Sequence, residues 1–414
     1  MSTAVIATRS SLGRFVIPVI ALGFLAVGLG GWDFADWHWG VAGVVLYGIP
    51  LACCAFRSTV VRVWGLWFGV FLVAQTVLSV LLPFPPNDYI TLPPNMNVRV
   101  DPAVYGLRGI TGLQSVTSDG HGFRVQPPVD YNRADALRIF AIGGSTTECL
   151  SLDDLATWPH LLQDELQDRL HKPVQVINTG ISGSRARYHL TTLHDILDLH
   201  PSAVIILVGA NDWVRQIRLK FATIPLWFED LQLKNTLLGL AIERGVQEIS
   251  ALLATPHAPA APQIDNGTDV RAWQHSLDRP TTRHFTPDAV DPDYADYLER
   301  ISALCHQQNL PCVFVTQPTA YAPEASAEMR ATFWMTPPFK LFTLPLDEMT
   351  RIAGLYNRYL IDFAHRHNDA VCDLASELAP TFDNFYDDEH YNTSGARNVA
   401  NDLLPCVAAA LAGR

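Results

Sequence analysis

The sequence predicts a doubly wound α/β domain built on a parallel sheet and preceded by three membrane-spanning helices. Three observations lead to this fold class. The first 84 of the 414 residues contain only six charged side chains. In the rest of the chain, short β-rich runs alternate with helical patterns. Some runs are apolar throughout, such as Val-Ile-Ile-Leu-Val at residues 204–208, which is typical of strands in a sheet covered on both faces.

Residues 1–84 are expected to form a membrane anchor. Uncharged stretches of 18, 18 and 22 residues occupy positions 15–32, 39–56 and 63–84, and about 20 helical residues cross a bilayer. The alternative for the first stretch is a cleaved signal peptide, but residues 29–33 make a poor cleavage site. For the other two stretches, the alternative is a buried hairpin of a soluble protein.

Charged residues around these stretches predict their orientation. Arg9 and Arg14 precede the first stretch, and Arg57 and Arg62 lie in the turn between the second and third stretches. The turn between the first and second stretches contains only acidic charges, Asp33 and Asp36. Because basic residues near span ends stay on the cytoplasmic side, the N-terminus is expected in the cytoplasm. Three crossings of the inner membrane then place the rest of the chain in the periplasm, whereas two would leave it in the cytoplasm.

Composition excludes two classes of function. Residues 85–414 carry 25 basic and 39 acidic side chains, and a nucleic-acid binder needs an excess of Lys and Arg on one face. Gln75 is the only strongly polar side chain well inside a predicted span. We therefore expect neither a nucleic-acid partner nor a transport path.

After the anchor, residues 85–135 are expected to lead to a catalytic domain at 136–414, and the Pro- and Asn-rich stretch at 83–102 is typical of an extended tether. The domain's strands are expected at residues 137–142, 174–177, 203–208, 312–316 and 370–374, and its helices around 155–170, 186–199 and 346–367. In such sheets, reactive groups gather beyond the carboxyl ends of the strands. The turns at those ends are therefore where a site is expected.

The first strand ends in Gly-Gly-Ser-Thr-Thr-Glu at residues 143–148. This run places Ser145 on a glycine-containing turn at a helix start, where N–H groups stabilise nearby negative charge. Ser145 with Glu148 also fits a capping box, which is a purely structural interpretation.

The next two strands end in Asn-Thr-Gly-Ile-Ser-Gly at 178–183 and Gly-Ala-Asn-Asp at 209–212. A glycine N–H and an asparagine side-chain amide from these runs can supply the donors that a tetrahedral oxyanion needs beside a serine. Each run taken alone is an ordinary turn after a strand.

Near the C-terminus, Asp387 and His390 are three residues apart. One turn of backbone can then hold the carboxylate near the ring and orient the ring as a base. For a single Asp/His pair, the alternative is a solvated loop.

Together these four runs resemble the SGNH (GDSL-like) hydrolase superfamily, whose Ser, Gly, Asn and His blocks occur in this order across residues 137–400. The resemblance implies a three-layer α/β/α sandwich with Ser145 as nucleophile, His390 as base and Asp387 orienting it. It also implies an oxyanion hole made by the Ser145 N–H, the Gly183 N–H and the Asn211 amide. No metal or organic cofactor is implied.

The sequence departs from that pattern in two ways. The usual Gly-Asp-Ser is Gly-Gly-Ser here, and the long interval between Asn211 and His390 leaves room for an insertion at about 213–292. The insertion's helix-like stretch at 231–253 is expected to be a helix packed on the core, or else a lid or a membrane-facing surface. An apolar patch around Phe333 and Phe342 is a further candidate for the cleft.

Other signals are weaker. Asp-Gly-His-Gly-Phe-Arg at 119–124 is similar to a segment of membrane-tethered SGNH proteins that acylate cell-envelope polysaccharides. Thr147 excludes the G-x-S-x-G elbow of α/β-hydrolases. Five cysteines follow the anchor, so at least one is expected to be free, and their spacing selects no disulfide pair.

These features predict a membrane-anchored serine esterase or O-acyltransferase that acts on an acetyl ester of an extracytoplasmic glycan or lipid. Its partners would be that substrate, the lipid bilayer and, for transfer from a cytoplasmic donor, a multi-span membrane protein. The alternative is a catalytically idle SGNH-like scaffold that binds a glycan or organises an envelope complex.

Overall fold

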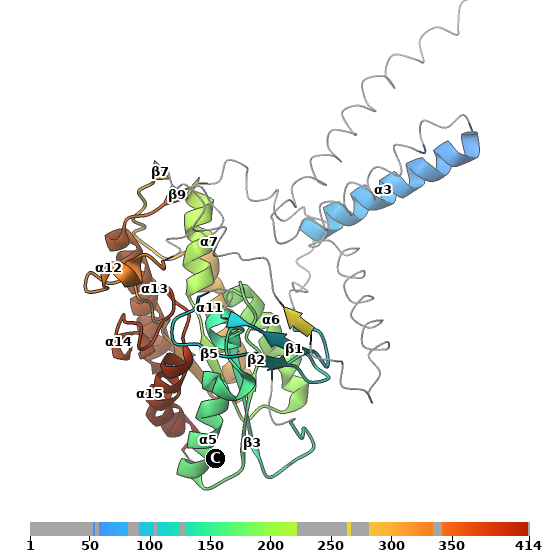
Figure 1. Cartoon of the computed structure of the whole chain (residues 1–414). Helices are drawn as coiled ribbons and strands as arrows, with labels where there is room; N and C mark the ends of the chain where they lie inside the picture. The colour runs from blue at the N-terminus through green and yellow to red at the C-terminus, as the bar shows by residue number, and fades with distance from the viewer. Residues whose placement is uncertain are drawn as a thin grey trace, which may run out of the picture. The chain divides into compact units, whose positions relative to one another are not determined.

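The computed structural model describes residues 53, 58–81, 91–102, 106–124, 129–221, 263–265, 281–333 and 342–412 (Figure 1). The chain divides into two compact units, and the described part of the first consists of residue 53, residue 58 and helix α3 (Thr59–Leu81). This helix covers most of the third predicted span, whereas the span at 15–32 and, apart from residue 53, the span at 39–56 lie outside the described residues. Over the described ranges, no helix combines the length and the apolar character that a membrane crossing requires.

The second unit contains a five-stranded sheet in the order β10-β8-β5-β3-β4, and every neighbouring pair is parallel. Its strands are β3 (Leu137–Gly143), β4 (Val174–Asn178), β5 (Ala203–Leu207), β8 (Cys312–Val315) and β10 (Ala370–Cys372). All residues of β5 and β8 are buried. The predicted α/β class with a parallel sheet is therefore confirmed.

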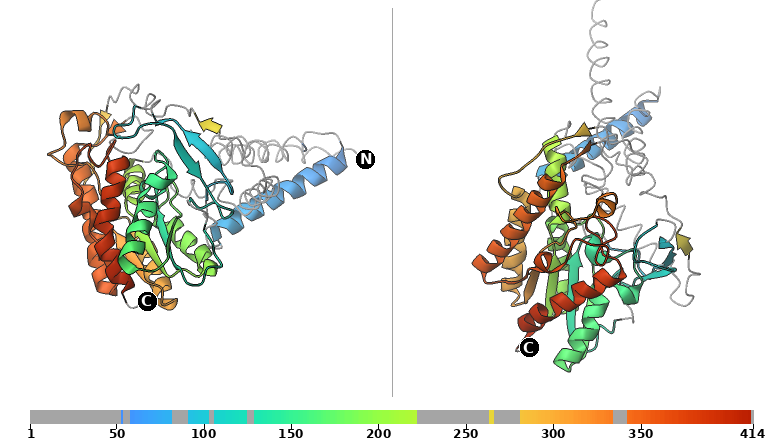
Figure 2. Two further views of the ribbon diagram at one scale, coloured as in Figure 1. Left: turned by 60° about the horizontal axis from the view of Figure 1, so that its bottom comes forward. Right: turned by 60° about the vertical axis from the view of Figure 1, so that its left-hand side comes forward.

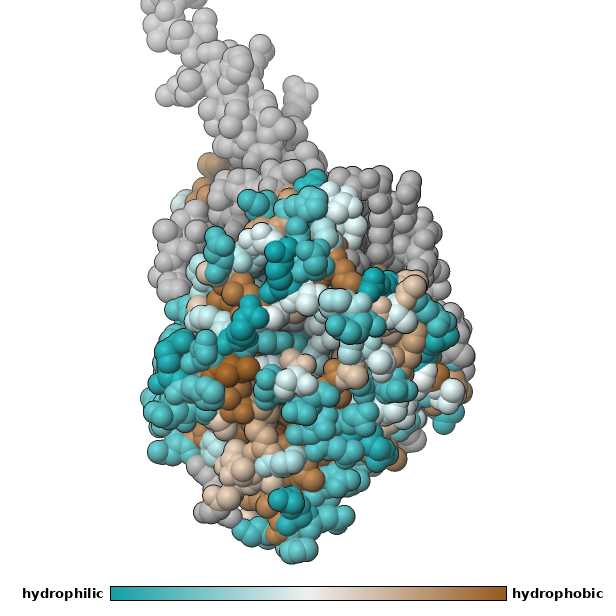
Figure 3. Space-filling view, turned by 90° about the vertical axis from the view of Figure 1, so that its left-hand side faces the viewer, coloured by the Kyte–Doolittle hydropathy of each residue, from teal (hydrophilic) through white to brown (hydrophobic). Residues whose placement is uncertain are grey.

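Helices cover the sheet (Figure 2). α5 packs against α15 and α6 packs against α11, while rings of α11 and α13 meet through Tyr294 and Tyr356. The longer helices are α5 (Trp158–Leu170), α6 (Ala186–Ile196), α7 (Ala210–Phe221), α11 (Pro292–Gln307), α13 (Leu346–His367) and α15 (Thr393–Leu411). The core between these layers is apolar, and hydrophilic side chains occupy most of the face shown in Figure 3.

The chain passes from β3 to its neighbour β4 and then returns to β5 on the other side of β3. This reversal makes a switch point at the carboxyl ends of β3 and β5, where ligands bind in sheets of this kind. Short helices lie beside or between the longer elements: α4 (Ser145–Glu148), η2 (Asp154–Ala156), η3 (Leu197–Leu199), α12 (Ala327–Arg330) and α14 (Leu374–Glu377).

The segment expected to be an extended tether contains a strand. β1 (Asn97–Val100) pairs antiparallel with β2 (Gln114–Thr117) and parallel with β6 (Gln263–Asp265). Pairing satisfies the backbone groups that a tether would leave to water, so this stretch belongs to the folded unit. A further pair joins β7 (Thr281–Thr282) to β9 (Phe342–Thr343).

Two disulfides join elements of the second unit. Cys305 of α11 is bonded to Cys312 of β8, and Cys372 of β10 is bonded to Cys406 of α15. Cys149 is buried and free. The structure thus selects pairs that spacing alone left open.

Most of the predicted insertion, including its helix-like stretch, lies outside the described residues. The flanking aromatic patch does not line a cleft where it is described. Phe333 stacks edge-on against Tyr321, and Phe342 stacks edge-on against Phe221. Both phenylalanines are buried in the core because they have aromatic neighbours to pack against.

Candidate active site

Ser145 is the first residue of α4, and only Gly144 separates it from the end of strand β3. Gly144 is the N-cap residue, in an extended conformation, and no side chain caps the helix. The carboxylate of Glu148 instead accepts hydrogen bonds from the backbone N–H of Ser182, at 2.7 Å, and from its hydroxyl. Ser145 and Glu148 therefore do not form the capping box that their spacing allows.

Ser145, His390 and Asp387 lie in one line of contacts. Nε2 of His390 is 2.7 Å from the hydroxyl oxygen of Ser145. Nδ1 of the same ring is 2.8 Å and 3.0 Å from the two carboxylate oxygens of Asp387. A carboxylate only accepts, so Nδ1 is assigned the proton and Nε2 is left to accept one from the serine.

The loop that carries the histidine is fixed from several sides. The fully buried Asp387 accepts the backbone N–H groups of Glu389 and His390, at 3.0 Å and 2.7 Å. The ring of Tyr386 stacks on the histidine ring at a centroid distance of 5.7 Å. The carbonyl of Asp388 accepts the N–H of Ala320 at 2.7 Å. The imidazole is consequently held with little freedom to turn.

Three successive carboxyl groups precede the histidine, and burial changes their ionisation. Burial and, to a lesser extent, the nearby charge of Asp387 together raise the pKa of Asp388 to about 6. Burial also raises the pKa of Glu389 to about 8, although His390 opposes that shift. Glu389 therefore loses its proton at a higher pH than an ordinary glutamate.

The Gly and Asn blocks meet beside the serine because β4 and β5 flank β3. The side-chain amide of Asn211 donates to the carbonyl of Ser184 at 2.9 Å. That amide also touches Gly144, since a Cβ atom built there would lie 2.6 Å from Nδ2 of Asn211. Gly183 precedes Ser184 and has φ +82°, a left-handed conformation that favours glycine.

A small pocket opens next to the serine. Its lining residues come from the nucleophile helix, the loop after it and the histidine loop; they are Ser145, Thr146, Cys149, Ser151, Leu152, Tyr386, His390 and Tyr391. Burial raises the pKa of the Cys149 thiol to about 12. The thiol is therefore protonated and forms part of the wall rather than a second nucleophile.

The structure thus brings all five site residues predicted from the sequence to one edge of the sheet. Sequence reasoning missed the residues that hold them, chiefly Tyr386, Arg124 and Asp154. Arg124 had a signal, because it ends the singled-out run at residues 119–124. Within the described residues, no group of His, Cys, Asp and Glu is arranged to hold a metal ion.

Comparison with known proteins places this site in a family. Residues 141–397 match the model of the GDSL-like Lipase/Acylhydrolase family. No curated protein matches the chain.

Solved structures similar to this chain include a catalytic mutant of Axe2, an acetylxylan esterase from Geobacillus stearothermophilus. It is 16% identical, the match covers 65% of this chain and 93% of that chain, and the TM-score is 0.38. Another is the psychrotrophic esterase EstA from Pseudoalteromonas sp., at 12% identity, 66% and 96% coverage and a TM-score of 0.34.

Proposed function

The chain belongs to the GDSL-like lipase/acylhydrolase family, and from this membership we propose a membrane-anchored serine esterase or O-acyltransferase acting on an acetyl ester of an extracytoplasmic glycan or lipid. That the chain is an ester hydrolase follows from the family match, which covers the sheet, the serine and the histidine. The nucleophile, the acyl group, the acceptor and the location are the parts that we add.

The observation that carries the proposal is the line of contacts from Ser145 through His390 to Asp387. A serine hydroxyl is a weak nucleophile until a neighbouring base takes its proton. Here a ring nitrogen lies 2.7 Å from that hydroxyl, within the reach that proton transfer requires. The buried carboxylate behind the ring favours the imidazolium that forms.

In the proposed reaction, Nε2 of His390 takes the proton of Ser145 while the serine oxygen attacks the ester carbonyl carbon. The tetrahedral intermediate collapses, and the same ring nitrogen protonates the departing alcohol. An acyl-enzyme remains on Ser145. Water or a sugar hydroxyl then attacks it, giving up its proton to His390, and the serine is released.

The negative oxygen of the intermediate needs donors that are already in place. The N–H of Ser145 is at the first turn of a helix and has no acceptor within that helix. Gly183 contributes a second N–H from an open, left-handed turn. Asn211 contributes its amide, which carries two N–H groups, and the bond to Ser184 fixes its direction.

The pocket supports a short acyl group. The enclosed space beside Ser145 is small and has about the volume of a single water molecule. Leu152 is fully buried in its wall, and Tyr386 is anchored through a 3.2 Å contact between its hydroxyl and that of Ser151. Such a narrow space favours a short acyl group such as acetyl over a long alkyl chain.

Hydrolysis and transfer use the same residues, so the acceptor decides between them. Transfer of acetyl from a cytoplasmic donor would require a multi-span membrane partner, because three spans are too few to carry the acyl group across. No metal or organic cofactor takes part in the proposed steps.

Three observations support a location outside the cytoplasmic membrane. The basic residues flanking the predicted spans favour a cytoplasmic N-terminus, and Trp64 and Trp67 of α3 are exposed by 72% and 67%, as expected for rings at a membrane interface. The two disulfides favour an oxidising compartment such as the periplasm.

The proposal is tested with the purified full chain and a series of p-nitrophenyl esters from acetate to octanoate. Wild type should hydrolyse the acetate ester and lose turnover as the acyl chain lengthens, and Ser145→Ala should be inactive on all of them. Activity that rises with chain length would contradict the acetyl assignment. A folded wild type that turns over no ester would favour the idle scaffold.

A further inference from the structure

The run Asp-Gly-His-Gly-Phe-Arg lies outside the residues that match the family and outside the proposed chemistry. Its first residue fixes a turn: the carboxylate of Asp119 accepts the N–H groups of His121 and Phe123, at 2.8 Å and 2.9 Å, and the hydroxyl of Tyr131. The turn directs the last residue, Arg124, into the protein, where only 3% of it is exposed.

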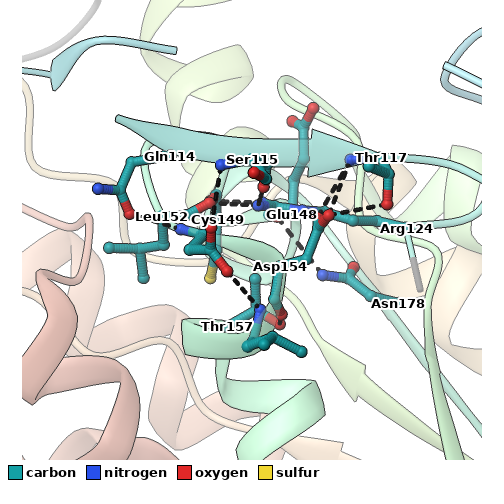
Figure 4. A network of polar contacts seen from close by, with 12 residues as sticks. Gln114, Ser115, Thr117, Arg124, Glu148, Cys149, Leu152, Asp154, Thr157 and Asn178 are labelled. Atoms are coloured by element: carbon teal, nitrogen blue, oxygen red, sulfur yellow. Dashed lines mark hydrogen bonds and ion pairs between the residues drawn. The ribbon is translucent and has the colours of Figure 1, made fainter. Parts of the chain in front are cut away.

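The guanidinium of Arg124 reaches the far end of the nucleophile helix (Figure 4). Nη1 donates to the carbonyl oxygens of Glu148 and Cys149, at 2.7 Å and 2.5 Å, and Nη2 donates to the carbonyl of Leu152. Glu148 is the last residue of α4 and Cys149 is its C-cap. The N–H of Cys149 in turn bonds the carbonyl of Ser145 at 2.9 Å. Hydrogen bonds thus link Arg124 to the proposed nucleophile through a single residue, Cys149.

A four-residue helix cannot hold its own shape, because forming one turn costs more conformational entropy than its hydrogen bonds return. Its last carbonyl groups also lack partners within the helix. In α4, the guanidinium of Arg124, which lies outside the helix, donates hydrogen bonds to the carbonyl groups at the helix end. Cys149 is held at φ 54°, an uncommon conformation for a residue with a side chain. The turn that carries the nucleophile therefore depends on contacts that the turn itself does not contain.

A buried arginine is tolerated only when its charge is paired and its donors are satisfied. Nε of Arg124 lies 2.7 Å from the carboxylate of Asp154, whose side chain is 3% exposed. Asp154 also accepts the N–H and the hydroxyl of Thr117 on β2, at 3.0 Å and 2.8 Å. With the carbonyl of Ser115 at 3.5 Å from Nη2, each of the five N–H groups of Arg124 has an acceptor.

We infer that Arg124 is a positioning residue for the ester-cleaving reaction: it holds the carbonyl end of the nucleophile turn so that the Ser145 hydroxyl stays in line with His390, and Asp154 holds the guanidinium. The inference rests on the proposed role of Ser145. Since it concerns the geometry of attack rather than substrate contact, loss of Arg124 should lower kcat and leave KM nearly unchanged.

The chain offers a matched control in Arg138 of β3. This arginine is also buried, and its guanidinium donates to backbone carbonyls that include those of Tyr131 and Leu199. Those carbonyls lie at the beginning of β3 and away from Ser145. Lysine has a single ammonium and cannot span the acceptors of a guanidinium. Arg124→Lys and Arg138→Lys therefore remove similar contacts, but only the first affects the nucleophile turn.

The test compares these two variants with wild type and Ser145→Ala in the full chain. The readouts are the midpoint of thermal unfolding, kcat and KM on the acetate ester, and the rate of fluorophosphonate labelling. Arg124→Lys should lower kcat and labelling rate together by roughly tenfold to a hundredfold, as a small misplacement of a reacting group does. Arg138→Lys should lower the unfolding midpoint but keep kcat within about twofold of wild type.

Equal effects of the two lysine variants on kcat at equal loss of stability would overturn the inference, and so would an unchanged kcat in Arg124→Lys. If Arg124→Lys does not fold, Asp154→Asn keeps the guanidinium but removes its counter-charge, and it should lower kcat with KM unchanged. Turnover and labelling that persist in Ser145→Ala would instead overturn the proposed nucleophile itself.

Discussion

The side-chain amide of Asn211 lies against the backbone of Gly144, so closely that a Cβ atom at position 144 would stand 2.6 Å from Nδ2 of Asn211. The contact joins the turn after β5 to the turn after β3, at the residue before Ser145. It gives a physical reason for glycine at a position where the usual motif has aspartate, because a side chain there would compete with the amide for space.

Gly144→Ala should therefore affect catalysis more than folding. The added methyl group displaces the end of a side chain rather than backbone, so the unfolding midpoint should change little, while the proposed oxyanion donor moves. We expect kcat to fall by roughly tenfold to a hundredfold. Gly120→Ala is the control, since a Cβ atom there meets nothing within 4 Å. Equal kcat values for the two variants would contradict the role of the contact.

Asn211→Ala should lower kcat by roughly a hundredfold to a thousandfold with little change in KM, as expected for loss of one oxyanion donor. Combined with Gly144→Ala, it should show strong non-additivity, because the glycine variant acts through the same amide. Steady-state kinetics of the two single variants and the double variant measure this directly. Additive losses would mean that the two residues act separately, and a change confined to KM would mean that Asn211 binds substrate.

The acyl pocket can be enlarged at Leu152, which is fully buried in its wall. Leu152→Ala should raise the ratio of butyrate to acetate turnover, because the truncated side chain leaves room for further methylene groups. Leu162→Ala of α5 is the matched control: this leucine is equally buried but does not line the pocket. It should lose stability by about 2–5 kcal/mol and keep the wild-type preference. The same ratio in both variants would show that the pocket does not select the acyl group.

Asp212 of α7 should make stability depend on pH. Burial raises its pKa from the ordinary 3.8 to about 7. The charge of Asp291 also raises this pKa, whereas the charges of Arg185 and Arg215 lower it. Between about pH 4 and pH 7 the unfolded chain has lost this proton while the folded chain keeps it. Rising pH in that window therefore favours the unfolded state, and the loss is complete above it.

Asp212→Asn carries no such proton, so its unfolding midpoint should fall less than that of wild type between pH 5 and pH 7. Thermal unfolding by circular dichroism at several pH values provides the comparison. Parallel curves for the two proteins would show that Asp212 does not titrate in this window.

Topology is tested with a reporter that is active only in the periplasm. Fused after Arg414 it should be active, and fused at Thr59, in the second turn of the predicted anchor, it should be inactive. An inactive reporter after Arg414 would mean that the catalytic residues lie in the cytoplasm. An extracytoplasmic substrate would then be excluded, but the proposed chemistry of Ser145 would be unaffected.

The sequence predicted the sheet well because its strands are apolar on both faces and short. All five strands of the main sheet begin within one residue of their expected positions. Helices α7, α11 and α15 were not predicted, and α15 contains Pro405 in its interior. A local signal for it does exist: the side chain of Asn392 accepts the N–H of Gly395 at 2.8 Å and caps the helix start.

The site was predictable to the extent that its residues follow strands or lie close together in sequence. Asp387 and His390 are three residues apart, and parallel strands bring Ser145 and Asn211 to one edge. The support from Arg124 could not be foreseen, because all but one of its acceptors lie 24 to 30 residues further along and meet it only in the folded chain. The disulfide pairs likewise depend on which helix covers which strand.

The most direct test of the account is the site of covalent labelling. The full chain is treated with a fluorophosphonate probe, digested, and mapped by mass spectrometry. We predict one adduct, on the peptide that contains Ser145, absent from Ser145→Ala and formed far more slowly in His390→Ala, because the histidine takes the serine proton. An adduct on another residue, or equal labelling of wild type and Ser145→Ala, would contradict the assignment of Ser145 as the nucleophile.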